Sequence, residues 1–320
     1  HGYTSELDST LFYGNITPVN KDRKLAITIN TYGEDVESVG YKIRSLEDKS
    51  LIENTEVSGY QVTDNKINVT LNIKNLLDTG KEYALEVVLK TKKHDAVYYY
   101  TRIMYGTDYD LQKKLDFVRD FNACTFDSAR LKDIGGYLET SSVGDNTNYG
   151  KVNINCSLSQ IGWGDLEPYI ESEITPEIIS INDDVAIIRL DYRVGAANDY
   201  SSSDTYNVNE YYRIRQTNSG FYLLNFEREM NQVFDAKNDL TSSAKINLGI
   251  NSSTYVNCTS DENGIYTYFV NQGSLWCFSS SSQTFTRVFS FRGEETDSVR
   301  EDYDAHNIKI MKIEDNGDAT

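Results

Sequence analysis

Aromatic side chains are the residues of this chain that most plainly suit ligand binding. Trp163 lies between two glycines, a pattern typical of a turn, and Trp276 alternates with apolar neighbours as in a strand. Tyr98 and Tyr100 belong to a run of three tyrosines, whose side chains must point to both faces of a strand. Exposed Trp and Tyr rings stack on sugars or anchor protein partners. These four residues are candidate ligand-binding residues, with core or cross-strand packing as the alternative for the two tryptophans.

Carboxylates are the second source of chemistry in this sequence. The chain has 49 Asp and Glu residues, so some of them will lie close together in any fold. Glycoside hydrolysis needs one protonated and one ionised carboxyl flanking the scissile bond. The sequence does not select such a pair, and we assign no catalytic residue. A secreted carbohydrate-active enzyme that uses paired carboxylates therefore stays as the alternative function.

Complete motifs for metals, nucleophiles and nucleotides are absent from the sequence. The three histidines are far apart, at positions 1, 94 and 306, and none of the four cysteines forms a Cys-x-x-Cys pair. No Gly-x-Ser-x-Gly elbow and no phosphate-binding glycine loop occurs. We therefore predict no metal site and no cofactor. The cysteines themselves, Cys124, Cys156, Cys258 and Cys277, are compatible with free thiols or with one or two disulfides.

The charge of the chain limits its partners. Its net charge is −18, whereas nucleic acids require clustered Lys and Arg. No apolar run is long enough for a membrane span. The predicted partner is therefore a protein or a carbohydrate, with no nucleic acid and no membrane span within this chain.

Both ends of the chain carry expectations about its context. It opens on His1-Gly2 rather than Met, which is expected after removal of a targeting segment. The segment 314–318 has turn composition but no returning strand after it, as expected of a fragment of a longer protein. An Asn-, Lys-, Ile- and Tyr-rich composition with 3 Pro favours a bacterial source. We expect an extracytoplasmic protein, either secreted or anchored at the cell surface.

The elements that would position these residues are mostly strands. In residues 11–106, apolar side chains alternate with polar ones in the segments 25–29, 67–73 and 83–89, and turn residues separate these segments. A period of two indicates strands with one buried face. About seven short strands in such a length are typical of a β-sandwich.

One segment of this region carries a resemblance to a known family. The sequence Leu-Leu-Asp-Thr-Gly-Lys-Glu-Tyr at 76–83 resembles the corner between strands E and F of fibronectin type III and other immunoglobulin-like domains. The resemblance implies that the Tyr83 hydroxyl bonds to the backbone of this corner. Residues 1–107 contain no Trp, unlike type III domains, so the resemblance is to immunoglobulin-like sandwiches in general. We expect such a domain at residues 1–107.

The next segment changes to helical spacing. Leu111, Leu115 and Val118 fall on one face of a helix predicted over 107–122, with Phe117 and Phe121 beside them. We expect a helical connector at 108–124 that packs against the following domain.

Strand patterns return in residues 125–320. Strands predicted at 187–194, 210–216, 220–226 and 232–237 form a four-stranded meander, and a second meander is predicted at 254–258, 265–270, 274–278 and 284–291. The polar segment 198–209 is predicted as an exposed loop. The segments 220–226 and 264–270 can be aligned at an offset of 44 residues, which resembles the blade repeat of β-propeller proteins. A plain meander or a second sandwich is the alternative.

The fold class expected from these patterns is mainly β. An immunoglobulin-like sandwich is joined by a short helix to a larger antiparallel β domain at 125–320, which is expected to be propeller-like. A propeller typically has four or more blades, and this stretch is barely long enough for four, so we expect the domain to be truncated. The expected function is an extracytoplasmic, non-enzymatic binding or structural module that recognises a protein or a glycan.

Overall fold

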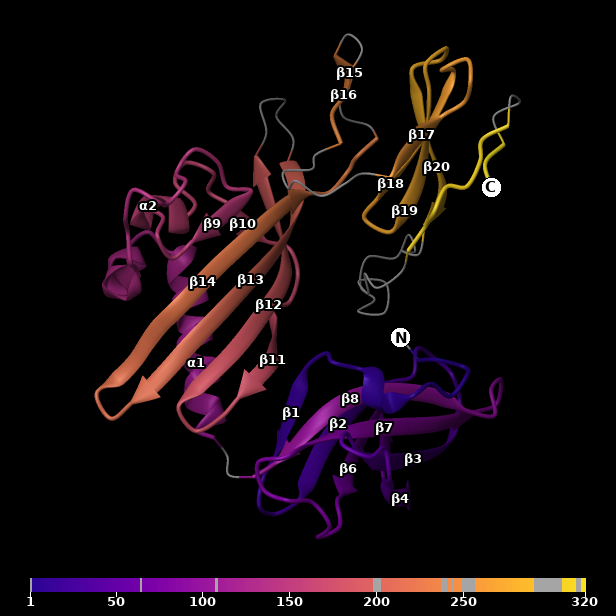
Figure 1. Ribbon diagram of the computed structural model, residues 1–320, viewed down its shortest axis with the longest axis vertical. Helices are drawn as coiled ribbons and strands as arrows, with labels where there is room; N and C mark the ends of the chain where they lie inside the picture. The colour runs from indigo at the N-terminus through magenta and orange to yellow at the C-terminus, as the bar shows by residue number, and fades with distance from the viewer. Residues whose placement is uncertain are drawn as a thin grey trace.

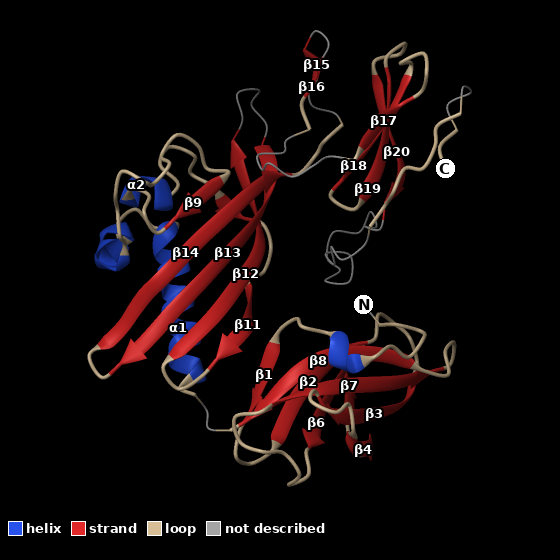
Figure 2. Cartoon of the chain, viewed as in Figure 1, coloured by secondary structure: helices blue, strands red, loops and turns tan. Residues whose placement is uncertain are grey.

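The chain has a mainly β fold, as the sequence predicts (Figures 1 and 2). This computed structural model describes residues 2–63, 65–106, 109–197, 203–236, 241–242, 245–248, 257–290, 307–314 and 318–320. Their buried hydrophobic side chains gather in three clusters that follow the three main groups of strands, except that Ile16 and Met104 of the first group belong to the cluster of the second.

The N-terminal strands form two facing sheets. The first sheet has the order β1-β8-β7-β3-β4, in which β1 is parallel to β8 and the other neighbours are antiparallel. The second has the order β2-β6-β5. The elements are η1 (Ser9–Leu11), β1 (Ile16–Val19), β2 (Lys24–Asn30), β3 (Val36–Ser45), β4 (Leu51–Val57), β5 (Gln61–Thr63), β6 (Lys66–Asn72), β7 (Glu82–Thr91) and β8 (Val97–Tyr105).

Alternate residues of both sheets fill the core between them. Ile43 and Leu85 from the first sheet and Leu71 from the second are all buried in one cluster, which makes the arrangement sandwich-like. At the corner before β7, the backbone N–H of Asp78 donates a 2.8 Å hydrogen bond to the hydroxyl of Tyr83. This is the contact that the resemblance at 76–83 implies.

A long antiparallel sheet and a helix follow the sandwich. The sheet has the order β10-β12-β13-β14-β9, and β11 also pairs with β12. Helix α1 lies along one face of this sheet (Figure 1), and its Val118 and Phe121 are buried in the shared core. The elements are α1 (Leu111–Thr125), η2 (Leu131–Tyr137), β9 (Lys151–Asn153), α2 (Leu158–Ile161), β10 (Tyr169–Ile170), β11 (Thr175–Ile181), β12 (Val185–Ala197), β13 (Ser203–Thr217) and β14 (Gly220–Gln232).

Two details of this sheet differ from the sequence-based expectation. Residues 203–209, predicted as part of a loop, belong to β13, because β12 extends to Ala197 and supplies their backbone partners. Residues 198–202 of that predicted loop lie outside the described part. Of the strand predicted at 232–237, only Gln232 is in a strand, as the last residue of β14, and residues 233–236 are not in a strand, whereas residue 237 lies outside the described part. The upstream strand β9 pairs with the outer edge of β14.

A smaller sheet with the order β17-β18-β19-β20 completes the described strands, together with the β15-β16 pair. Its last three strands match those predicted at 265–270, 274–278 and 284–291, and the strand predicted at 254–258 overlaps β17 only at Cys258. Residues 254–256 and 291 lie outside the described part. The small and long sheets differ in strand number, length and order, so the described residues do not form two matching blades. The elements are β15 (Thr241–Ser242), β16 (Lys245–Ile246), β17 (Cys258–Ser260), β18 (Tyr266–Asn271), β19 (Ser274–Ser279) and β20 (Thr284–Ser290).

The structure also answers the question that the cysteines left open. All four are free thiols: Cys124 and Cys156 are buried, Cys277 is half-buried and Cys258 is exposed. Across the described ranges, we find no helix with the length and apolar character that crossing a membrane requires.

Candidate functional site

The two faces of the long sheet have opposite chemistry. Val208 and Tyr212 of β13, together with Phe226 and Met230 of β14, are buried on the side of helix α1. Because side chains alternate between the faces of a strand, the residues between them point away from the helix. We call that side the open face of the sheet.

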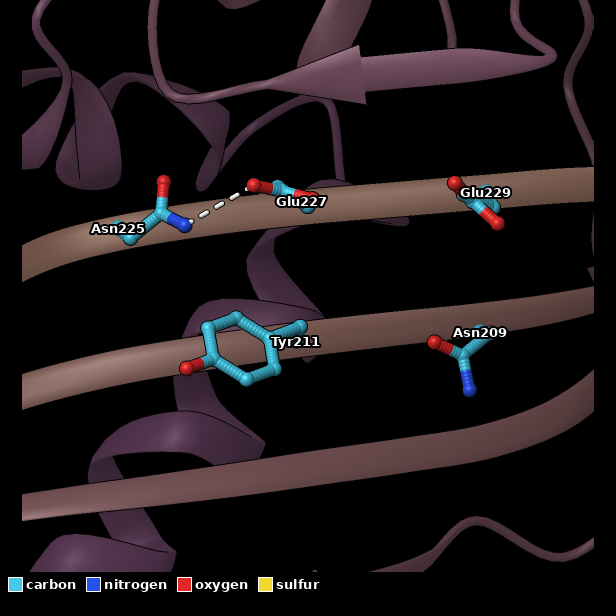
Figure 3. Close-up of a pocket in the computed structure, with 5 residues that line it drawn as sticks. All are labelled: Asn209, Tyr211, Asn225, Glu227 and Glu229. Carbon is cyan, nitrogen blue, oxygen red and sulfur yellow. Dashed lines mark hydrogen bonds between the residues drawn. The ribbon is translucent and has the colours of Figure 1, made fainter.

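A hollow of about 360 Å³ lies on the open face. Figure 3 shows its five lining residues, which come from two neighbouring strands. Tyr211 of β13 is directly opposite Glu227 of β14, and Asn209 is opposite Glu229. We call these four residues and Asn225 the hollow residues.

A bulge in β14 decides which residues line the hollow. Leu223 pairs with Ile214 and Asn225 pairs with Arg213, so Leu224 is the extra residue on β14. An extra residue reverses which side chains of the strand face the core. Because of the bulge, Asn225 and the residues at 227 and 229 all point to the open face.

The hollow combines a flat aromatic ring with polar groups. Figure 3 shows the Tyr211 ring face-on, lying along β13 rather than standing away from the sheet. The Asn225 side-chain amide donates a 3.1 Å hydrogen bond to Glu227, and the Lys151 ammonium lies 3.5 Å from Glu229. Together, the amide, phenol and carboxylate groups can donate hydrogen bonds to a polar ligand and accept hydrogen bonds from it.

The strand register extends the hollow into two rows of polar side chains that cross five strands. We call them the Tyr211 row and the Asn209 row. In the order β11, β12, β13, β14 and β9, the Tyr211 row is Glu177, Arg189, Tyr211, Glu227 and Asn153, and the Asn209 row is Thr175, Asp191, Asn209, Glu229 and Lys151.

Ion pairs within the rows hold the Arg189 side chain of β12 in place. The Arg189 guanidinium lies 2.5 Å from the Glu177 carboxylate and 2.9 Å from that of Asp191. Asn209 also donates a hydrogen bond to Asp191. The rows together carry four carboxylates and two cations, which gives a net charge of −2.

A buried ionic cluster lies directly behind the hollow, on the helix side of the sheet. Glu210 is fully buried, and its carboxylate accepts hydrogen bonds from Asn122 of α1 (2.8 Å), Tyr192 of β12 (3.0 Å) and Tyr212 of β13 (2.6 Å). Arg228 of β14, also fully buried, is directly opposite Glu210, with 3.9 Å between their closest charged atoms. We call these five residues the buried cluster.

Arg228 joins the sheet to the segment around α2. Its guanidinium lies 3.4 Å from the centre of the Trp163 ring and donates hydrogen bonds to the backbone carbonyls of Gln160 (3.0 Å) and Ile161 (2.9 Å). Burial lowers the pKa of Arg228, and the neighbouring Glu210 carboxylate opposes this shift. The charged form is thus held by a partner anion, an aromatic face and two carbonyls.

The tyrosines of the buried cluster should make the stability of the fold depend on pH in the alkaline range. Burial, followed by the nearby charge of Glu210, raises the pKa of Tyr192 and of Tyr212 well above the ordinary value. Each of these phenols has a higher pKa in the folded state than in the unfolded state. Its contribution to stability is therefore fully present below the unfolded-state pKa of about 10 and is lost as the pH rises from there toward the folded-state pKa. We expect these phenols to ionise only as the protein unfolds.

Tyrosinate absorbance and circular dichroism, recorded together from pH 8 to 13, measure this. The expected result is a late absorbance step that coincides with loss of β signal, and the late step is smaller in Tyr212→Phe. Ionisation of every phenol while the β signal stays intact would contradict the burial of Tyr192 and Tyr212.

The two candidate tryptophans are packed against other side chains. Trp163 is 1% exposed, and its ring packs against the Arg228 guanidinium. Trp276 is half-buried in the small sheet, with its ring 4.8 Å from that of Phe234. Neither ring contributes to the hollow.

The two candidate tyrosines lie in the sandwich. Tyr98 and Tyr100 share one face of β8, with ring centres 6.4 Å apart, and both are half-buried. The Phe12 ring stacks on Tyr100 at 4.5 Å, and the Leu7 N–H donates to the Tyr100 hydroxyl at 2.8 Å. The segment before β1 therefore packs on these rings, and the structure does not bring them together with the candidate tryptophans.

Sequence reasoning did not identify the hollow residues. Asn209 falls in the segment predicted as a loop, and the bulge at Leu224 interrupts the period-two pattern of β14. One incomplete signal was present: Asn207, Asn209 and Tyr211 alternate with Val208 and Tyr212, as in a strand with one open face, but the charged Glu210 interrupts the apolar positions.

Neither the grouping of possible metal ligands nor the comparison with known proteins points to an activity. Among the described residues, no three His, Cys, Asp or Glu side chains are grouped as a metal ion would need. Comparison with family models and with curated proteins gives no match for this chain. The open face of the long sheet is therefore the candidate functional site.

Proposed function

We propose that this chain is a non-enzymatic binding module that holds a glycan on the open face of its long sheet. The hollow around Tyr211 is the observation that carries the proposal, because it presents a flat aromatic ring among amide and carboxylate groups. Sugar rings have apolar faces that stack on aromatic side chains and hydroxyls that need both donors and acceptors.

The placement of the carboxylates supports binding rather than hydrolysis. Glu227 and Glu229 project from the same strand toward the same face. The two carboxyl groups of a glycosidase flank the scissile bond, one of them with a raised pKa. Two neighbours on one open strand suit hydrogen bonding to hydroxyls better than attack from opposite sides.

The proposal includes the setting of the module. We propose an extracytoplasmic protein in which an immunoglobulin-like sandwich precedes the binding sheet. The corner hydrogen bond between Tyr83 and Asp78 supports the immunoglobulin-like assignment.

Saccharide arrays followed by calorimetry on the purified chain test the function. We expect Tyr211→Ala to weaken binding of the best array saccharide at least about tenfold, which corresponds to 1.4 kcal/mol. Tyr222→Ala is the matched control, because Tyr222 is an exposed tyrosine of β14 outside the hollow. Absence of binding to every saccharide, or equal losses in the two variants, would refute the proposed site.

A further inference from the structure

We infer that the glycan is a linear chain of neutral or amino sugars that runs across the strands along the Tyr211 row and the Asn209 row. The inference rests on the proposed function and adds the charge, the length and the direction of the ligand. It draws on the register of the five strands and on the charges that they carry to the open face.

The direction follows from where the polar groups lie. Neighbouring strands are 4.7–4.9 Å apart, so rows that cross five strands extend about 19 Å. That spacing is comparable to the length of one sugar ring, so a chain that crosses the sheet meets a new strand with about every sugar. A ligand laid along one strand would instead meet few of the paired amide and carboxylate groups.

The charge of the rows selects against acidic glycans. The Arg189 guanidinium is already engaged by two carboxylates, and the Lys151 ammonium lies beside Glu229. Neither cation is placed to neutralise an acidic sugar, and the chain as a whole carries −18. Arg193 and Arg213 also point to the open face, just outside the rows. Within the rows the net charge of −2 disfavours uronic or sulfated sugars, whereas the amine of an amino sugar can pair with Glu227.

A peptide fits this face less well than a saccharide chain. Extended peptides usually pair with the edge of a sheet, where free backbone groups and side-chain pockets recognise them. The side chains along both rows are polar apart from the Tyr211 ring, and they offer no apolar pocket for anchoring residues. Hydroxyls, which donate and accept, match such a surface more closely.

The Asn209 row ends on two exposed residues that only a long ligand could reach. Thr175 of β11 and Lys151 of β9 are exposed at the two ends of the Asn209 row. Tyr211 and Asn209 lie at the centre, on β13. A short saccharide would contact the centre alone, and a longer one would reach the ends as well.

Calorimetry with oligomers of glucose, glucosamine and galacturonic acid, from one unit to eight, tests this. We expect affinity for the glucose or glucosamine series to rise with length up to about five units, one for each strand, and then to level off. Galacturonic acid oligomers should bind at least tenfold more weakly than glucosamine oligomers of the same length.

Variants at the row ends separate this inference from the function. Thr175→Val and Lys151→Ala should weaken binding of the five-unit oligomer several-fold and leave that of the dimer within twofold, whereas Tyr211→Ala should weaken both. Tyr222→Ala should change neither. Affinity that does not depend on length, or a preference for galacturonic acid, overturns the inference while the proposed function stands. Failure of every oligomer and every array saccharide to bind overturns the function itself.

Discussion

Replacing Arg228 with methionine should lower the free energy of unfolding by about 3–5 kcal/mol, the range found when one partner of a buried ion pair is removed. The change leaves the Glu210 carboxylate buried without its cation. It also removes the donors to the carbonyls of Gln160 and Ile161 and the charge that stacks on Trp163. Urea unfolding followed by tryptophan fluorescence measures the loss, because Trp163 reports on this region directly.

Two further variants show whether the cost comes from the broken pair. Arg213→Met removes an exposed arginine from the same sheet and should change stability by less than about 0.5 kcal/mol. The double variant Glu210→Gln with Arg228→Met should lose less than the sum of the two single changes, because it leaves no unpaired buried charge. If Arg228→Met costs no more than Arg213→Met, the buried cluster does not stabilise the sheet.

Lys114→Met should cost about 3 kcal/mol or more, since it leaves three carbonyls without their donor at about 1–3 kcal/mol for each buried one. The Lys114 ammonium is fully buried and donates to the backbone carbonyls of Tyr109 (2.6 Å), Asn182 (2.6 Å) and Asp183 (2.8 Å). It thereby ties the first turn of α1 to the turn between β11 and β12. Because Tyr109 lies just before α1, the same contact holds the chain where it leaves the sandwich.

Hydrogen exchange adds a local measurement to the unfolding experiment. In Lys114→Met we expect faster exchange at 109–114 and 182–185, while the sandwich strands stay protected. Lys113→Met is the matched control: Lys113 is exposed, pairs with Asp110 at 2.8 Å and should contribute at most about 1 kcal/mol. Equal effects of the two lysine variants would show that the carbonyl contacts contribute little.

The local sequence pattern determined the class of the fold. Alternation of apolar and polar residues in segments such as 67–73 and 83–89 is enough to predict strands with one buried face, because the side-chain period of a strand is a property of its backbone. The spacing of Leu111, Leu115 and Val118 gave helix α1 in the same way. The resemblance of the segment at 76–83 to an immunoglobulin-like corner implied the hydrogen bond of Tyr83, whose donor is five residues away in the chain.

Tertiary structure alone decided which strands pair and which side chains are covered. Strand β9 joins the edge of β14 across more than 70 residues of chain, and nothing local in either segment specifies that partner. Trp163 became a buried ring because Arg228, 65 positions later, lies over it. The bulge at Leu224 places Asn225 beside Glu227 on the open face. The hollow depends on which strands pair and on a one-residue bulge, and the alternation of side chains along a strand specifies neither. The sequence alone therefore predicted a β protein but not the face that we propose binds the glycan.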